Sequence, residues 1–507
     1  MSGVAIPNAP GVYTNVQPPP YQVQGVPTDI IGFVGIASWG PKNVPMTLGN
    51  MADAIRTFGP MQNALMDIVT SVFLAMQEGA NAFLGVRVTD GTDTAASVDL
   101  MDTATTPAEG ALLTALYTGT VGNTITAAIT AGSVSGTYTL TITRAGYTPE
   151  VFGNIGGSGS AFWQNLVTAV TQGTASRGPS SIVTAALPST QSTSAPNVTT
   201  TYTLAGGTNG NASVTATTQV GTPSSPKTGM YALSGTEAAY VVLCDNDDAS
   251  TFVTIDAFAK ANNMYGMGSG PSGQYTNSSS AVNFFSATGV ADYNFKFALG
   301  DWGWFQDNYN NVQRLVSPLA AYAGRLAVLP PNASGLNKPI RAFFATQSSM
   351  AGYRYDKDEI ALYRTNGIDL IAFRKRSGRN VLVIGNGINT SSNPTTQDDS
   401  YTRLTNYLAA TFTLAGEYYE GGVQTPKFWA DEEGSLSDFL SNLSNPPAGI
   451  DPVIAGYDVL IDAATNPQSE TSLGLNNGSI SVQYFGIAVK VIFTFTGGSS
   501  VVISNAA

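Results

Sequence analysis

The stretches IIGFVGIA, residues 30–37, and NALMDIVTSVFLAMQEGANAFLGVRV, residues 63–88, decide the fold. The first is a continuous apolar run of strand length, which is typical of a strand buried on both faces of a sheet. In the second, apolar residues recur at spacings of three and four up to Gly79, which predicts a helix with a glycine C-cap; AFLGVRV, residues 82–88, is a further strand. Strand, helix and strand in this order predict parallel neighbours joined by a right-handed crossover, and hence an α/β domain.

The same pattern returns in the second half of the chain. AAYVVLCDNDD at 238–248 reads as a buried strand that includes the single cysteine, Cys244, and a helical pattern follows it. Further strands are expected in NMYGMG at 263–268 and YNFKFALGDW at 293–302, and DEIALYRTNGIDLIAFRK at 358–375 predicts a helix, a turn and a strand.

Between these parts, from about Ala111 to Met230, only four residues are charged and Thr, Ser, Gly and Ala dominate. The alternating runs GTYTLTITRAGY at 136–147 and NVTTTYTLAGG at 197–207 predict strands, with a helix around AFWQNLVTAV. We interpret this segment as an inserted, largely β domain; a disordered Ser/Thr-rich linker is the alternative.

The C-terminal part begins with an amphipathic helix in YTRLTNYLAATFTLAGEYY, residues 401–419, and a second helix follows at SLSDFLSNL with Ser435 as its expected N-cap. FGIAVKVIFTF, residues 485–495, alternates apolar residues along one face, which predicts a strand that belongs in a core. SSVVISNAA, residues 499–507, is a last strand candidate that either folds back as a hairpin or extends as an arm.

The N-terminal stretch NAPGVYTNVQPPPYQVQG, residues 8–25, contains a strand without a local partner. Residues 12–16 alternate in the manner of a strand, and Pro18 to Pro20 follow almost at once. Three prolines favour a stiff spacer and prevent a tight return, so a partner strand has to come from elsewhere.

Composition excludes several classes of function. The chain of 507 residues is 43% hydrophobic and only 11% charged, with a net charge of −12 that argues against a nucleic-acid partner. It contains no histidine, so Ser-His and Cys-His nucleophile pairs and histidine metal sites cannot form within it. One cysteine excludes an internal disulfide, and no run approaches the length of a membrane span, so we expect no insertion into a membrane.

Three motifs are candidates for chemistry, and each is weak. Gly268, Gly270 and Gly273 match the dinucleotide-binding spacing with Asp292 downstream, but Pro271 interrupts the expected helix start, which favours an ordinary loop. Two carboxylate clusters lack the regular spacing of a calcium loop and are better explained as turn or helix-terminal charges. They consist of Asp245, Asp247 and Asp248, and of Asp431, Glu432 and Glu433. We therefore predict no catalytic residue, no cofactor and no metal site.

The run FRKRSGR concentrates four of the 22 basic residues of the chain within six positions: Arg374, Lys375, Arg376 and Arg379. A solvated hairpin is one interpretation. The other is a contact patch for an acidic surface, including a second copy of this chain.

Several blocks, in their order and spacing, resemble the contractile tail sheath proteins of bacteriophages, a family related to tailocin and type VI secretion sheaths. The blocks are PGVY at 10–13, TDIIGFVGIASWGPKNVPMTLGNMADAIRTFGP at 28–60, AFLGVRV at 82–88, SPLAAYAGRLAVLP at 317–330, NGIDLIAFRKRSGRNVLVIGNG at 366–387 and YTRLTNYL at 401–408. The segment 111–230 matches least, as outward-facing insertions in this family do.

The resemblance implies an α/β (α+β) multidomain structure made of several parts. They are an N-terminal linking arm (1–25), a central α/β domain in two pieces (26–110 and 231–384) separated by an inserted β-rich outer domain (111–230), a C-terminal inner sheath domain (385–498) and a C-terminal linking arm (499–507). The expected inter-subunit arm residues are Val12, Tyr13, Thr14 and Val16, and Val501, Val502 and Ile503. Arg374, Lys375, Arg376 and Arg379 become candidates for a contact between sheath subunits or with the tube.

The implied function is structural rather than enzymatic: stacked six-subunit rings around a tail tube that contract to drive the tube through the host envelope. The implied partners are further copies of the chain, the tail tube protein, and baseplate and tail terminator proteins, in a virion tail assembled in the host bacterial cytoplasm. Alternatives are the sheath of a tailocin or other contractile injection system and, more distantly, a β-rich adhesin.

Overall fold

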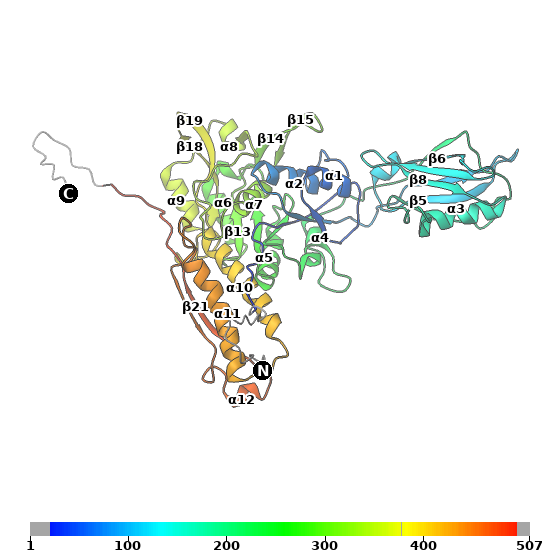
Figure 1. Cartoon of the computed structure of the whole chain (residues 1–507). Coiled ribbons are helices and arrows are strands. Elements are labelled where there is room, and N and C mark those ends of the chain that lie inside the picture. The colour runs from blue at the N-terminus through cyan, green and yellow to red at the C-terminus, as the bar shows by residue number, and fades with distance from the viewer. Residues whose placement is uncertain (1–20, 377, 494–507) are drawn as a thin grey trace, which may run out of the picture. The chain divides into compact units, whose positions relative to one another are not determined.

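The computed structural model of the protein describes residues 21–376 and 378–493 (Figure 1). The chain divides into two compact units. The large unit comprises Pro27–Asn406, and the described part of the small unit comprises residues 21–26 and 407–493. Helix α10 (Asp399–Tyr419) begins in the first and ends in the second.

A seven-stranded sheet forms the centre of the large unit, in the order β17-β13-β12-β11-β1-β3-β2. Its strands are β1 (Ile31–Gly35), β2 (Met46–Leu48), β3 (Phe83–Arg87), β11 (Tyr240–Leu243), β12 (Tyr265–Ser269), β13 (Phe295–Ala298) and β17 (Ile368–Asp369). All neighbours pair in parallel except β2, which lies antiparallel to β3 at one edge. The predicted strands at 30–37 and 82–88 are therefore adjacent and parallel, which confirms the α/β fold class.

Both faces of this sheet are covered, which explains why its strands are continuously apolar. Ile31 and Phe33 of β1 belong to one hydrophobic cluster, together with side chains of α2 (Ile68–Gln77) and α7 (Leu319–Ala327). Val34 points into a second cluster with residues of α5 (Phe252–Ala261), α6 (Ser278–Ser286) and α9 (Lys357–Thr365). Successive side chains of a strand point to opposite faces, so each strand of this sheet contributes to two cores.

Local signals set the ends of these helices. Asp67 caps α2 by accepting the Thr70 amide, and Gly79, at φ +104°, follows directly after the C-cap, as the sequence predicts. Pro318 is the N-cap residue of α7. Helix α1 (Met51–Phe58) and strand β2 complete the region between β1 and α2.

The inserted segment is built from two antiparallel sheets and one helix. The sheets are β4 (Ser97–Met101), β5 (Glu109–Ala115) and β9 (Val183–Ala186), in the order β4-β5-β9, and β10 (Thr201–Thr203), β6 (Thr126–Ala131), β7 (Tyr138–Thr143) and β8 (Glu150–Ile155), in that order. With α3 (Ser160–Gln172) they enclose a third cluster, in which Phe162 and Trp163 are buried. The segment is thus folded and largely β, and the alternative of a disordered linker is wrong.

Buried arginines attach this insertion to the central sheet. Arg87, at the end of β3, is fully buried and donates hydrogen bonds to the carbonyls of Gly40, Thr118 and Asn209. Thr118 lies between β5 and β6 of the insertion, and Asn209 follows its strand β10, so one side chain holds two separate segments of the insertion. Arg144 adds a cation–π contact, with its guanidinium 4.5 Å from the ring centroid of Trp39.

The rest of the large unit contains two smaller antiparallel groups. One comprises β14 (Gly303–Asp307), β15 (Val312–Val316) and β16 (Ala345–Thr346), and the other is the hairpin of β18 (Ile371–Arg376) and β19 (Arg379–Ile384). Short helices α4 (Ala216–Val220) and α8 (Gln347–Met350) lie in the connections.

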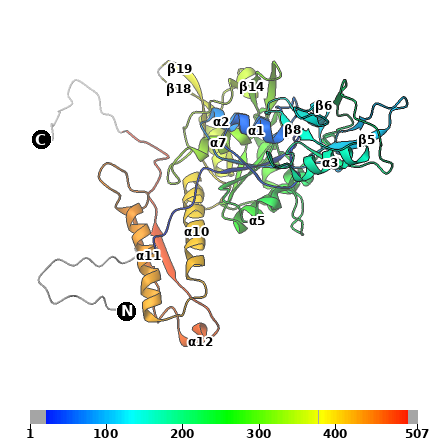
Figure 2. The ribbon, with the colours of Figure 1, turned by 45° about the vertical axis from the view of Figure 1, so that its right-hand side comes forward.

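In the small unit, the second part of α10 runs alongside α11 (Pro426–Ser444) (Figure 2). Strands β20 (Gly456–Leu460) and β21 (Ser479–Gln483) form a two-stranded sheet, with α12 (Gln468–Thr471) between them in the chain. The expected N-cap at Ser435 is wrong: α11 begins nine residues earlier at Pro426, with Thr425 as N-cap, and Ser435 bonds back to the Asp431 carbonyl within the helix. Throughout the described ranges, no helix is both long and apolar enough to cross a bilayer.

Candidate functional site

Val12, Tyr13, Thr14 and Val16 and the C-terminal Val501, Val502 and Ile503 lie outside the described residues. The chain directly after the proline spacer is described, and it is anchored within the small unit. The Tyr21 ring stacks on Tyr418 with 3.9 Å between centroids, and Val26 donates its amide to Thr411 of α10.

The sheet of β20 and β21 has two open edges. The strands pair with each other over five residue pairs, from Gly456–Gln483 to Leu460–Ser479, and with no other strand of the described chain. Helix α11 packs against β20. Unpaired edge amides and carbonyls are a template for a further strand.

Residues 484–493, which follow β21, correct one prediction. The sequence indicates a core strand over 485–495, but the part of it that is described has no regular secondary structure. Val491, Ile492 and Phe493 are 68%, 86% and 88% exposed. An alternation of apolar and polar residues indicates that a segment suits one face of a sheet. A strand also needs a neighbouring strand with which to pair. The described chain supplies none for this segment.

The basic run lies on the hairpin of β18 and β19. Its base is buried, with Ile371 and Leu382 in the core, while Arg374, Lys375 and Arg379 near the tip are exposed. The register places Arg376 opposite Arg379 and Arg374 opposite Val381, so Arg374 and Arg379 share one face. Among the ion pairs of the described residues, none involves Arg374, Lys375 or Arg379.

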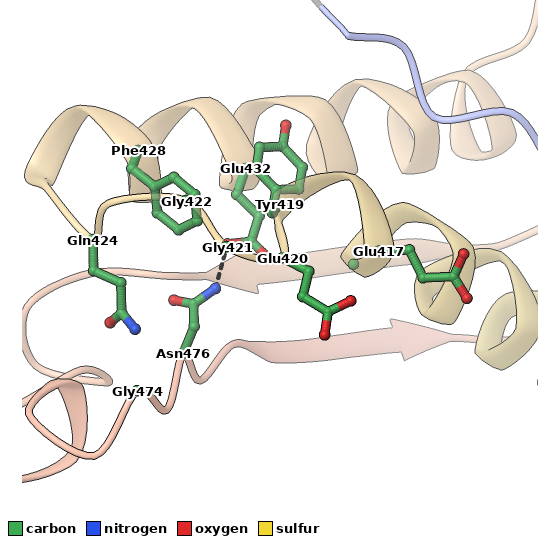
Figure 3. Close-up of a pocket in the computed structure, with 11 residues that line it drawn as sticks. Glu417, Tyr419, Glu420, Gly421, Gly422, Gln424, Phe428, Glu432, Gly474 and Asn476 are labelled. Atoms are coloured by element: carbon green, nitrogen blue, oxygen red, sulfur yellow. Dashed lines mark hydrogen bonds between the residues drawn. The ribbon is translucent and has the colours of Figure 1, made fainter.

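A groove of about 480 Å³ lies in the small unit, between the end of α10, the start of α11 and the loop at Gly474–Asn476 (Figure 3). Glu417 and Glu420 stand at its rim and Glu432 lies deeper, where it accepts a hydrogen bond of 2.6 Å from Asn476. Tyr419 and Phe428 supply an aromatic wall, with ring centroids 5.6 Å apart. We call this feature the acidic groove; it was not predicted from the sequence, because its carboxylates come from separate helices.

The glycine motif is an internally bonded loop at the end of β12. The carbonyl of Gly270 accepts the Trp302 indole N–H at 3.0 Å, and the amide of Gly273 donates to the side chain of Gln347 at 2.9 Å. A phosphate cradle needs free backbone amides, and here a side-chain amide already engages the Gly273 donor. Asp292 pairs with Lys260 at 2.5 Å. These contacts support the interpretation as an ordinary loop.

The carboxylate clusters bind the protein's own groups. Asp245 accepts the backbone amides of Met66 and Ser317, each at 2.9 Å, which ties β11 to two other segments. Asp248 caps the short helical turn that begins at Ala249. Asp431 pairs with Lys427 within α11, and Glu433 accepts the amide of Ile461. The described residues contain no group of three or more His, Cys, Asp or Glu side chains arranged to hold a metal ion.

A buried charge network, which no sequence motif predicted, fixes the start of α10. Lys296 of β13 is 1% exposed and donates to Asp369 at 2.6 Å and to Asp399 at 3.0 Å. Tyr265 donates to the same Asp399 carboxylate at 2.6 Å. Burial alone would lower the pKa of Lys296, but the two carboxylates outweigh it and the pKa is raised. The network, with a charged lysine at its centre, therefore joins three sheet strands, β12, β13 and β17, to α10.

The sequence matches no protein-family model and no curated protein. Solved structures do match. The sheath tail protein of Listeria innocua has a TM-score of 0.60 at 15% identity, over 91% of this chain and 96% of that chain. The sheath tail protein of Desulfitobacterium hafniense has a TM-score of 0.55 at 14% identity, over 90% and 94%. The PVC sheath of an extracellular contractile injection system, in its contracted state, has a TM-score of 0.53 at 12% identity, over 98% and 99%. The chain has the fold of these sheath proteins.

Proposed function

We propose that the chain is the structural subunit of a contractile phage tail sheath. It polymerises as stacked six-subunit rings around a tail tube and contracts to drive the tube through the host envelope during genome delivery. The observation that carries the proposal is the extent of the likeness: at least 90% of this chain aligns with sheath chains that are themselves at least 94% covered. Both compact units are therefore needed to account for the match.

The energy for contraction comes from assembly rather than from nucleotide hydrolysis. The extended sheath is held by a kinetic barrier, and a trigger at the baseplate releases it into a shorter and more stable lattice. A non-enzymatic role agrees with the internal bonding of the Gly273 loop and of Asp245, which serve the fold of the large unit.

Strand exchange between copies joins the subunits. The open edges of β20 and β21 suit an added strand, and two segments of this chain have strand patterns in their sequence: residues 12–16 and residues 485–495. We assign residues 1–25 and 499–507 as linking arms, with the largely exposed residues 485–493 preceding the second. Head-to-tail contacts that do not close on themselves generate a helical lattice.

The remaining assignments follow from the same proposal. The domain division is the one that the resemblance implies, with 385–498 as the inner domain and 111–230 as the outer one. The partners are further copies of the chain, the tube protein, and baseplate and terminator proteins. The site of action is the virion tail, after assembly in the host cytoplasm.

Electron microscopy of the purified chain in negative stain tests the proposal. Tubes or ring stacks are expected, and a chain that remains monomeric at high concentration contradicts it. Deletion of residues 1–17 is expected to leave a folded subunit that no longer polymerises. Tubes of normal appearance from this deletion would disprove the assignment of the N-terminal arm.

A second candidate is a sheath in a contractile particle other than an infectious phage. The PVC sheath, from an extracellular contractile injection system, is covered over 99% of its length. The two candidates share the subunit's mechanics and differ in the particle, so images of labelled particles with or without a DNA-filled head distinguish them.

A further inference from the structure

The large and small units differ strongly in charge. Residues 407–507 contain ten carboxylates and two lysines, a net charge of −8, and residues 1–26 contain no charged side chain. Residues 27–406 contain 24 carboxylates and 20 basic residues, a net charge of −4. Two thirds of the net charge of −12 thus lies in one quarter of the chain, while four basic residues gather on one hairpin of the large unit.

We propose that the basic tip of the β18–β19 hairpin docks into the acidic groove of a second copy of the chain. This deepens the proposed function, on whose self-assembly it rests, by naming the residues of one contact between subunits. On the donor copy the contact consists of Arg374, Lys375 and Arg379; on the receiving copy it consists of Glu417 and Glu420, with Tyr419 and Phe428 behind them.

The chemistry of the groove suits long basic side chains. Glu417 and Glu420 take part in none of the ion pairs of the described residues, so their charges are available to a partner. The rings of Tyr419 and Phe428 offer faces on which a guanidinium stacks. Gln424, which also lines the groove, has a buried side-chain oxygen without a hydrogen-bond partner in the described part of the chain.

The hairpin is built to present its charges. Gly378, at φ +78°, lies in the turn, where a residue with a side chain would be strained. The base of the hairpin is held in the hydrophobic core by residues such as Ile371 and Ile384, so the exposed tip is supported by a rigid ladder of six paired positions. Preorganised charges lose less freedom on binding than charges on a loop.

The basic hairpin and the acidic groove are complementary in charge. A basic element on one unit and an acidic groove on the other make a head-to-tail contact, in which each copy uses both surfaces with different neighbours. Such a contact extends an array instead of closing a dimer. It also gives assembly a dependence on salt, because the charges are exposed and screened.

Charge reversal in assembled tubes tests the contact. Arg374→Glu with Arg379→Glu, and separately Glu417→Lys with Glu420→Lys, are expected to lower the amount of sedimentable tubes about tenfold or more. Combining all four changes is expected to restore much of the loss. The matched controls are Lys227→Glu with Lys357→Glu and Asp438→Lys with Asp451→Lys, which make the same charge changes at other exposed sites and are expected to leave assembly near wild type.

Thermal melting of each variant shows that it is folded, and a second readout does not depend on tubes. Carbodiimide cross-linking of the wild-type chain, followed by mass spectrometry, is expected to join Lys375 to Glu417 or Glu420 of another molecule. Loss of assembly in the hairpin variant alone, with no rescue and no such cross-link, would show that the hairpin meets another partner and overturns the contact.

If the wild type forms tubes and both variants do so equally well, the contact is wrong and the proposed function stands. If the wild type forms no tubes, the proposed function fails, and the cross-link alone then decides the contact.

Discussion

The large and small units differ in how their apolar and charged side chains are packed. In the large unit, apolar side chains of the strands and helices pack into three hydrophobic clusters. Charged side chains such as Arg87 and Lys296 are also buried there, where they form hydrogen bonds or ion pairs. In the small unit, Leu473 and Ile492 are 75% and 86% exposed, and a two-stranded sheet has no third strand in the described residues. In the proposed array, these side chains and strand edges are surface that a neighbouring copy can bury.

The difference teaches how one chain can be both a stable body and a component of an array. Exposed apolar surface and open strand edges are liabilities in a monomer, and proteins retain them where a partner covers them. Substitutions in the hydrophobic clusters of the large unit are therefore expected to act on folding, and those on its basic hairpin or on the exposed surface of the small unit on assembly.

The largest expected effect tests the buried charge network of the large unit. Lys296→Ala removes the cation between Asp369 and Asp399 and leaves two uncompensated buried carboxylates. We expect it to lower the free energy of unfolding by about 3–5 kcal/mol. Lys260→Ala is the control, because it breaks an ion pair whose lysine is 56% exposed and is expected to cost less than about 1 kcal/mol. Equal losses in urea unfolding for both variants would contradict the assigned role of the network.

Sequence patterns predicted the fold wherever the spacing of apolar residues indicates which side chains are buried. The apolar run at Ile31–Gly35 and the spacing of α2 were sufficient for the central sheet, because a strand buried on both faces has a composition of its own. The β character of the insertion followed from alternation at Tyr138–Thr143. These patterns could not predict which residues far apart in the sequence contact one another in the fold.

The functional surfaces show the same limit. Lys296, Asp369 and Asp399 lie on three segments, and only the fold brings them within hydrogen-bonding distance. The acidic groove joins Glu417 of α10 to Glu432 of α11 and Asn476 of a loop. The basic run was found because its residues are neighbours in sequence. Residues 485–493, the described part of the strand predicted at 485–495, form no strand, because periodicity does not say whether a partner strand belongs to the same molecule.

The second prediction compares equal deletions of apolar volume in the two units. Leu326 of α7 is fully buried in the first hydrophobic cluster, so Leu326→Ala leaves a cavity and is expected to cost about 2–5 kcal/mol. Leu473→Ala, in the small unit, removes a side chain that is 75% exposed and is expected to change stability by less than about 0.5 kcal/mol. Differential scanning calorimetry measures both. A comparable loss at Leu473 would mean that the small unit covers its apolar residues after all.

The third prediction concerns the pH dependence of each unit. Burial raises the pKa of Asp67 to about 6, although hydrogen bonds from Thr70 and Gln62 oppose it. A raised carboxyl pKa means that the native state takes up its proton before the unfolded state does. Between pH 7 and pH 5 the contribution of Asp67 to the stability of the large unit is therefore expected to rise by on the order of 1 kcal/mol.

Asp67→Asn keeps a capping side chain and removes this titration, so the difference in melting temperature between wild type and variant is expected to change over this pH range. In the small unit, the stability contributed by Asp462 depends on pH in the opposite direction, because hydrogen bonds from the amides of Thr465 and Ala464 lower the pKa of Asp462. Its contribution is present above the unfolded pKa and is lost as the pH falls through the folded pKa. If the difference in melting temperature between wild type and Asp67→Asn does not change with pH, burial does not raise the pKa of Asp67.

The smallest expected effect lies on the surface of the small unit. Lys427 and Asp431 of α11 form an exposed ion pair four residues apart, with the lysine 81% exposed. The lysine precedes the acid, which is the weaker order for such pairs in a helix, and solvent screens both charges. Lys427→Ala is therefore expected to lower the free energy of unfolding by no more than about 0.3 kcal/mol. Because the lysine is one of only two cations after residue 406, its loss also makes the acidic small unit more negative. If the basic hairpin of a neighbouring copy docks there, Lys427→Ala should strengthen assembly at low salt while leaving melting unchanged, and weaker assembly would argue that the small unit does not receive a basic partner.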